Sequence, residues 1–133
     1  MKWVIIFDSN IWISFAIGKQ LSELNRFFAH PDIQIYVCDK LLKEVRATLL
    51  KPKVQKYVST ERQQMLMNIM SSCYWVEIEE QVIRSRDPND NFLLDMAQTV
   101  NADFLVTGDN DLLVLKKHFD TAIVSFHNFS QIV

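Results

Sequence analysis

The sequence has few of the residues that build phosphate loops, disulfide scaffolds or membrane spans. Two glycines among 133 residues leave neither a GxGxxG nor a GxxxxGK[ST] motif, which excludes glycine-rich dinucleotide and P-loop sites. Three prolines and no low-complexity run indicate no linker, so we expect one domain over residues 1–133. The two cysteines, Cys38 and Cys73, form no CxxC motif and are expected to be buried free thiols.

No apolar run approaches the ~18 residues that a membrane span requires, and Asp8 interrupts the apolar run at the N-terminus. The sequence therefore indicates neither a signal peptide nor a membrane segment, and we expect a cytoplasmic protein. The net charge of −2 is not that of a general nucleic-acid coat, and the 49% of hydrophobic residues is typical of a folded domain.

The stretch Trp3–Phe7 is a continuous apolar run, which predicts a strand buried on both faces. The rest of the chain alternates between short apolar runs and helical periodicity, which predicts an α/β domain around a central parallel sheet of four to five strands. Asp39 is the expected N-cap of the third helix. We expect strands over 3–7, 33–38, 74–78, 104–106 and 122–125, and helices over 11–17, 22–29, 40–50, 54–58, 60–70, 87–99 and 112–117, with 127–133 unassigned.

Four acids stand where such a fold would bring side chains together. Asp8 and Asp109 each follow a buried strand, Asp90 opens a helix, and Glu44 lies on the helix after the second strand. Because strand ends and the helices that leave them share one edge of a parallel sheet, these carboxylates are expected to converge there.

Converging carboxylates repel by ~4 kcal/mol at ~4 Å and an effective dielectric of 20, so they hold protons or bind a cation. All-oxygen ligands suit Mg²⁺ or Mn²⁺, which can activate water and neutralise charge on a phosphodiester. The alternative is that each acid acts locally, as we expect for Asp87 as a helix cap and for Asp95 and Asp111 in solvent, although Asp111 could reach the site. Spacing alone leaves the metal site and the local roles open.

Four segments together resemble the PIN domain family, a large group of metal-dependent ribonucleases, many of them toxins of bacterial toxin–antitoxin pairs. They are FDSNIWIS at 7–14, KLLKEV at 40–45, DPNDNFLLDMA at 87–97 and FLVTGDNDLL at 104–113. The resemblance covers nearly the whole chain in the family's order and implies a three-layer α/β/α PIN-like domain. It also implies a type II toxin with a cognate antitoxin protein as partner.

Carried over by position, Asp8, Glu44, Asp90 and Asp109 match the four acids of the family. The resemblance implies that Asp8, Asp90 and Asp109 hold one or two Mg²⁺ or Mn²⁺ ions, with Glu44 as a further ligand or as the group that orients water. It implies RNA cleavage that leaves 5′-phosphate and 3′-hydroxyl ends. Three further positions match polar residues that support the acids: Ser9, Asn10 and Thr107.

Six of the 14 basic residues lie within residues 40–56, around Glu44. Lys40, Lys43 and Arg46 are candidates for binding the RNA backbone, since lysine and arginine contacts with phosphates supply sequence-independent affinity. The alternative is a solvated helix face.

The remaining aromatic, histidine and apolar residues have weaker interpretations. Trp12 and Trp75 could stack on unpaired bases, although packing in a core or interface is the favoured interpretation. The three histidines show no metal-ligand spacing and are expected at the surface. The apolar surface of residues 11–17 and 21–28 favours a homodimer or an antitoxin groove.

Two other functions are compatible with this fold. A non-catalytic module would use the same scaffold to bind RNA or a protein partner. A phospho-accepting switch domain would also place acids at strand ends, but it leaves Glu44 and Asp90 without a role, and the strand-end lysine of such domains is missing.

Overall fold

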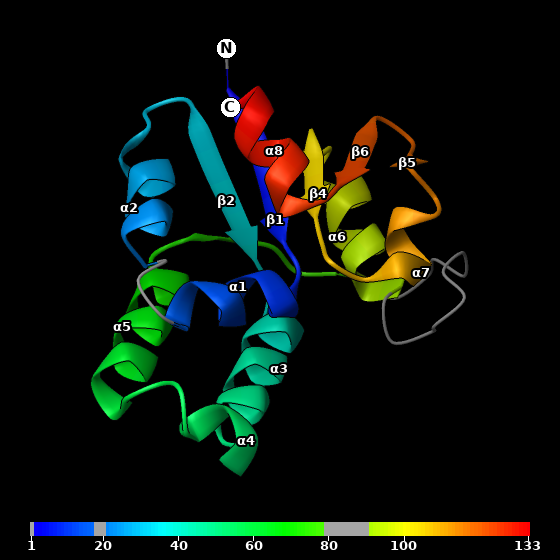
Figure 1. The fold of residues 1–133 in the computed structure, drawn as a ribbon. Coiled ribbons are helices and arrows are strands. Elements are labelled where there is room, and N and C mark those ends of the chain that lie inside the picture. Colours follow the sequence, from blue (N-terminus) through cyan, green and yellow to red (C-terminus); the bar gives the residue numbers. More distant parts are fainter. Residues whose placement is uncertain (1, 18–20, 79–90) are drawn as a thin grey trace.

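A computed structural model describes residues 2–17, 21–78 and 91–133. Its centre is a six-stranded sheet in the order β3-β2-β1-β4-β6-β5 (Figure 1). Every neighbouring pair is parallel except β5 with β6. The strands are β1 (Trp3–Phe7), β2 (Ile33–Val37), β3 (Tyr74–Trp75), β4 (Phe104–Val106), β5 (Lys117–His118) and β6 (Thr121–Val124).

Helices flank this sheet and extend beyond its carboxyl edge (Figure 1). They are α1 (Ser9–Ala16), α2 (Leu21–Ala29), α3 (Asp39–Leu49), α4 (Pro52–Gln55), α5 (Thr60–Ser71), α6 (Asn91–Val100), α7 (Asn110–Leu113) and α8 (Phe126–Ile132). The predicted α/β class with a mostly parallel sheet is therefore confirmed.

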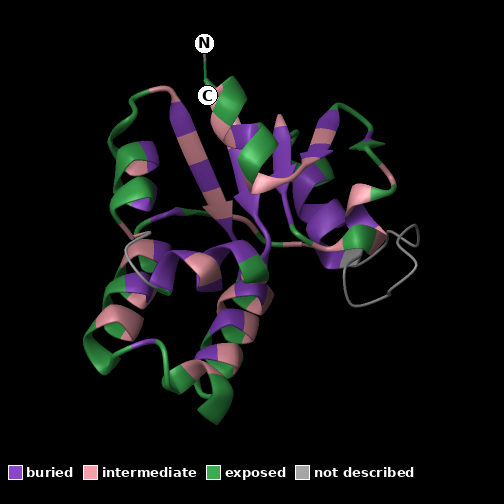
Figure 2. Ribbon diagram, viewed as in Figure 1, coloured by how far each residue is buried: buried purple, intermediate pink, exposed green. Residues whose placement is uncertain are grey.

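The core is organised around β1, whose last three residues are completely buried (Figure 2). The Phe7 ring makes edge contacts with Trp12 and Phe15 of α1 and with Phe129 of α8, at centroid distances of 5.5, 5.4 and 5.8 Å. Side chains alternate along a strand, so Ile6 points to the opposite face, where α6 packs on β1 and β4. Burial on both faces explains why β1 is a continuous apolar run.

The structure corrects the prediction for the C-terminal third of the chain. The helix expected over 112–117 ends at Leu113, and Lys117–His118 instead forms β5, antiparallel to β6. Lys116 and Phe119 adopt positive φ angles of 62° and 52°, which reverse the chain on either side of this short strand. The sheet thus has six strands, where four to five were expected.

The unassigned tail forms α8, capped by the Ser125 hydroxyl, which accepts a hydrogen bond from Asn128 N at 3.2 Å. Phe129 is fully buried in the core. Only one turn separates Phe126 from Phe129, which is too short a repeat to reveal a helix in the sequence.

Four smaller expectations also change. Cys38, not Asp39, caps α3, because its Sγ accepts a hydrogen bond from Leu41 N at 3.4 Å. The strand expected over 74–78 is limited to Tyr74–Trp75, and the short helix expected over 54–58 begins earlier, at Pro52. His118 is buried rather than at the surface, with Nε2 3.3 Å from Oε1 of Gln98.

Both cysteines are buried free thiols, as predicted. Burial raises the pKa of Cys73 to about 12, so this thiol stays protonated at neutral pH. Among the described residues, none of the helices is long and apolar enough to cross a bilayer.

Residues that were expected to form a dimer surface lie largely in the protein's own core. In α1, Ile11, Trp12, Ile13 and Phe15 are buried, which confirms a packing role for Trp12. In α2, the buried residues are Leu24 and Phe27. The homodimer stays a prediction, but these residues no longer argue for it.

Candidate active site

Asp8 lies at the point where β1 ends and α1 begins, and it caps that helix. Its main-chain N–H continues the sheet by donating to Val106 O at 2.9 Å. The side chain is only 4% exposed. Oδ1 accepts hydrogen bonds from Ser9 N at 2.6 Å and from Ser9 Oγ at 3.3 Å, while Oδ2 accepts one from Thr107 Oγ1 at 2.7 Å. The carboxylate is therefore held in one orientation from both sides.

Thr107 links the first strand-end acid to the second. It follows β4, is completely buried, and its Oγ1 accepts a hydrogen bond from Asp109 N at 3.0 Å while donating to Asp8. Asp109 in turn caps α7, with Oδ1 accepting from Asp111 N at 2.9 Å. Ser9 and Thr107, both expected beside the acids, thus donate hydrogen bonds to the Asp8 carboxylate.

Burial raises the pKa of Asp8, and the neighbouring charge of Asp109 raises it further. The hydrogen bonds from Thr107 and Ser9 act in the opposite direction by stabilising the ionised form. The net result is a pKa above the ordinary value. A carboxylate that is oriented but incompletely compensated is one that a cation would stabilise.

The raised pKa predicts a stability effect. The folded protein favours protonated Asp8, so the stability from this group is fully present below pH 3.8 and is lost as the pH rises through the raised pKa. The Asp8→Asn variant has no carboxyl group to ionise at this position, so it does not lose this stability as the pH rises. Without divalent metal we expect the variant to melt at a higher temperature than the wild type at pH 7, by roughly 3–5 °C per kcal/mol recovered.

The measurement is thermal unfolding in EDTA as a function of pH. The difference between the two proteins should shrink to nothing below pH 3.8, where wild-type Asp8 is protonated in both the folded and unfolded states. Equal melting temperatures at pH 7 would contradict the prediction.

The other predicted site residues are placed less completely. Asp90, together with Asp87, lies outside the described residues. Glu44 is half-buried on α3, and its negative charge contributes to a raised pKa of the Cys38 thiol, whose main cause is burial. Asn10, in the first turn of α1, is exposed.

The strand register relates Glu44 to Asp8 through Cys38. Ile6 pairs with Tyr36, and Asp8 and Cys38 each lie two residues beyond that pair. Glu44 therefore interacts with the strand end next to the one that carries Asp8.

The oxygen donors near Asp8 are of the type that Mg²⁺ and Mn²⁺ prefer. Within the ranges 2–17, 21–78 and 91–133 no three metal-ligating side chains form a cluster. The structure does bring together two carboxylates, Asp8 and Asp109, one of them buried and with a raised pKa. Two convergent carboxylates fit a hard divalent cation that keeps waters and takes further oxygen ligands.

The three candidate RNA-binding residues make contacts with different parts of the structure. The Lys40 Nζ lies 4.9 Å from the centre of the Phe92 ring of α6. Lys43 forms an exposed ion pair with Asp39 at 2.8 Å, and Arg46 borders a small cavity of about 130 Å³ between α3 and α5. Of the three, Lys40 is the one in contact with the helix that Asp90 was expected to open.

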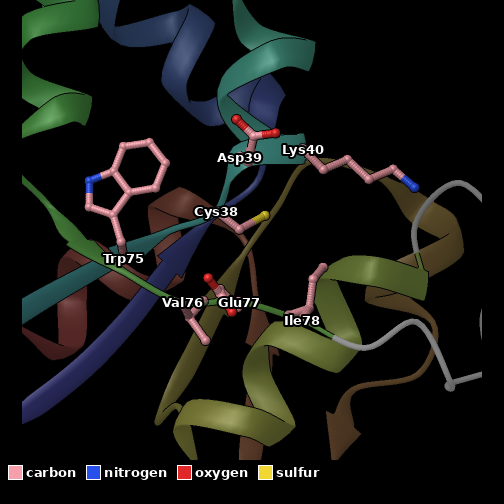
Figure 3. Close-up of a pocket in the computed structure, with 7 residues that line it drawn as sticks. All are labelled: Cys38, Asp39, Lys40, Trp75, Val76, Glu77 and Ile78. Carbon is pink, nitrogen blue, oxygen red and sulfur yellow. The ribbon is translucent and has the colours of Figure 1, made fainter.

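Two features of this region were not anticipated. Asp95 of α6, expected in solvent, is only 6% exposed. A cavity of about 790 Å³ lies between the amino end of α3 and the chain that continues from β3, bordered by residues 38–40 and 75–78 (Figure 3). The favoured expectation for Trp75 was packing in a core or interface, but its side chain is 46% exposed and borders this cavity.

Comparisons with known proteins agree with this arrangement. Residues 4–111 match the family described as PIN domain. The chain is 27% identical over 121 residues to the uncharacterized protein MJ1680 of Methanocaldococcus jannaschii, covering 87% of this chain and 77% of that protein.

Two solved structures share the fold at 16% sequence identity. One is the crystal structure of PAE2754 from Pyrobaculum aerophilum, with a TM-score of 0.61 over 99% of this chain and 98% of the other. The second is the PIN domain of RRP44 from T. brucei, with a TM-score of 0.53 over 98% of this chain and 80% of that one. The chain therefore belongs to the PIN domain family, whose members are typically nucleases and commonly use divalent metals.

Proposed function

We propose that this protein is a metal-dependent endoribonuclease that hydrolyses phosphodiester bonds of RNA. The observation that carries the proposal is the buried Asp8 carboxylate beside Asp109, oriented through Thr107 and with a raised pKa. Perturbed pKa values cluster at functional sites, and in open α/β sheets ligands bind at the carboxyl ends of the strands.

Asp8 and Asp109 would hold Mg²⁺ or Mn²⁺, and Asp90 and Glu44 are proposed to complete the site. When bound, the ion would supply neutralisation of phosphate charge and a lowered pKa for water. The protein's own contribution is orientation: Thr107 and the Ser9 N–H fix the two oxygens of Asp8 before substrate arrives. Preorganised groups need no rearrangement during the reaction.

The test is cleavage of an end-labelled single-stranded RNA by the purified protein with Mg²⁺ or Mn²⁺. We expect cleavage that EDTA abolishes and added metal restores, with 5′-phosphate on the new ends. A folded protein that cleaves no RNA with either metal would contradict the proposal.

We also propose that the protein is the cytoplasmic toxin of a type II toxin–antitoxin pair, with the antitoxin as protein partner. Its support is the motif resemblance given above, and the two buried free thiols suit a reducing compartment. Induced expression in bacteria should arrest growth, and the Asp8→Asn variant should not. Unchanged growth at equal protein levels would contradict the toxin role.

The second candidate is a non-catalytic module that binds RNA or a protein. It is favoured by one observation, that the described part of the chain holds no cluster of three metal-ligating side chains. It predicts RNA affinity that survives loss of Asp8, with weak metal binding in calorimetry.

A further inference from the structure

A cavity at the amino end of α3 is bordered by residues 38–40 and 75–78. Its volume of about 790 Å³ is in the range of small-ligand sites. Figure 3 shows Trp75 and Lys40 at opposite ends, with Cys38 and Glu77 between them. An aromatic ring, a cation and two carboxylates, those of Asp39 and Glu77, thus border one space.

The strand register places this cavity near the candidate active site. Val37 pairs with Trp75, and Val76 N donates to Val37 O at 3.0 Å, so the chain after β3 follows the end of β2. β2 is the immediate neighbour of β1, at the end of which Asp8 lies. Because β2 lies between β1 and β3, the axes of the strands that lead to Asp8 and carry Trp75 are two strand spacings apart, or roughly 10 Å.

Trp75 has the properties of a stacking platform. Its side chain is 46% exposed although tryptophan is costly to leave in water. Its indole N–H donates to Ser71 O at 3.3 Å, which restrains the ring. A restrained, exposed aromatic face stacks on any unpaired base.

Glu77 adds a hydrogen-bonding group to the cavity. An ionised carboxylate is an acceptor only, so it selects a partner that presents N–H donors. Guanine carries two adjacent donors, N1–H and the N2 amino group, on its Watson–Crick edge, which proteins read on unpaired bases.

We propose that this cavity binds an unpaired base of the RNA close to the cleaved bond, with Trp75 stacking on the base and Glu77 favouring guanine. This inference rests on the proposed ribonuclease function. Lys40 at the far end would lie along the backbone of the same strand.

The test compares Trp75→Ala and Trp75→Tyr with Phe119→Ala, a matched control that removes an aromatic side chain 65% exposed at the opposite edge of the sheet. Binding of a labelled single-stranded RNA is measured by fluorescence polarisation with Mg²⁺ in an Asp8→Asn background, which prevents cleavage. We expect Trp75→Ala to weaken binding about 5- to 150-fold. Trp75→Tyr should retain most of the affinity, and Phe119→Ala all of it.

Cleavage by the protein with intact Asp8 separates the two hypotheses. If that protein cleaves RNA and Trp75→Ala binds RNA as tightly as its parent, the cavity proposal is overturned and the ribonuclease stands. A protein partner would then be the remaining candidate occupant of the cavity. If the protein neither cleaves nor binds RNA, the ribonuclease proposal fails and the cavity proposal fails with it.

The role of Glu77 is tested with oligonucleotides that carry a single guanosine or inosine, which differ only in the N2 amino group. We expect guanosine to bind about tenfold more tightly, and Glu77→Gln to reduce that ratio. Equal binding of the two oligonucleotides by the parent protein would overturn the guanine preference.

Discussion

Asp8→Asn is expected to leave a folded protein whose RNA cleavage falls by about 10³-fold or more. The amide keeps the size of the side chain and can still accept from Ser9 N, so the cap of α1 is retained. It removes the negative charge that a divalent cation needs at the buried end of β1. Electrostatic stabilisation by a bound metal is worth several kcal/mol in the transition state, which corresponds to this loss of rate.

The measurement is single-turnover cleavage of labelled RNA at saturating protein, with circular dichroism to confirm the fold. Asp120→Asn is the matched control, since it makes the same chemical change at an exposed position on the turn between β5 and β6. It should cleave at the wild-type rate. Cleavage by Asp8→Asn within tenfold of wild type would remove Asp8 from the reaction.

Phe129→Ala is expected to lower the free energy of unfolding by about 3–5 kcal/mol. Phe129 is fully buried, and its ring contacts Phe7, Phe27 and Phe104 at centroid distances of 5.8, 5.2 and 5.8 Å. Truncation leaves a cavity among side chains of β1, α2 and β4, which cannot all move to fill it.

Urea unfolding followed by circular dichroism measures this change. Ile132→Ala, in the same helix but 54% exposed, is the control and should cost well under 1 kcal/mol. Similar losses for the two variants would show that α8 does not anchor the core through Phe129.

The elements that depend on local pattern could be predicted from the sequence. β1 can be predicted from its continuous apolar run, because a strand with three consecutive buried residues cannot place polar side chains there. The ends of β1 at Phe7 and of β4 at Val106 follow from the change to polar side chains at Asp8 and Thr107. The sequence alone therefore predicts that Asp8 and Asp109 share one edge of the sheet, because parallel strands align their carboxyl ends.

Elements with weak local signals were missed. β5 contains only two residues and depends on pairing with β6, while α8 shows only one repeat of its apolar spacing. The buried state of Asp95 and His118 was missed for the same reason: burial of a polar residue depends on neighbours distant in sequence.

The sequence by itself determined the α/β class, the positions of Asp8 and Asp109 just after two buried strands, and the match to the PIN domain family. Only the tertiary structure decided how Asp8 is held, because its partner Thr107 lies 99 residues away along the chain. It also decided that Trp75 stands exposed beside Glu77 in a cavity. Such contacts join residues from separate strands, and a hydrogen bond or a hollow between them leaves no periodic trace in the sequence.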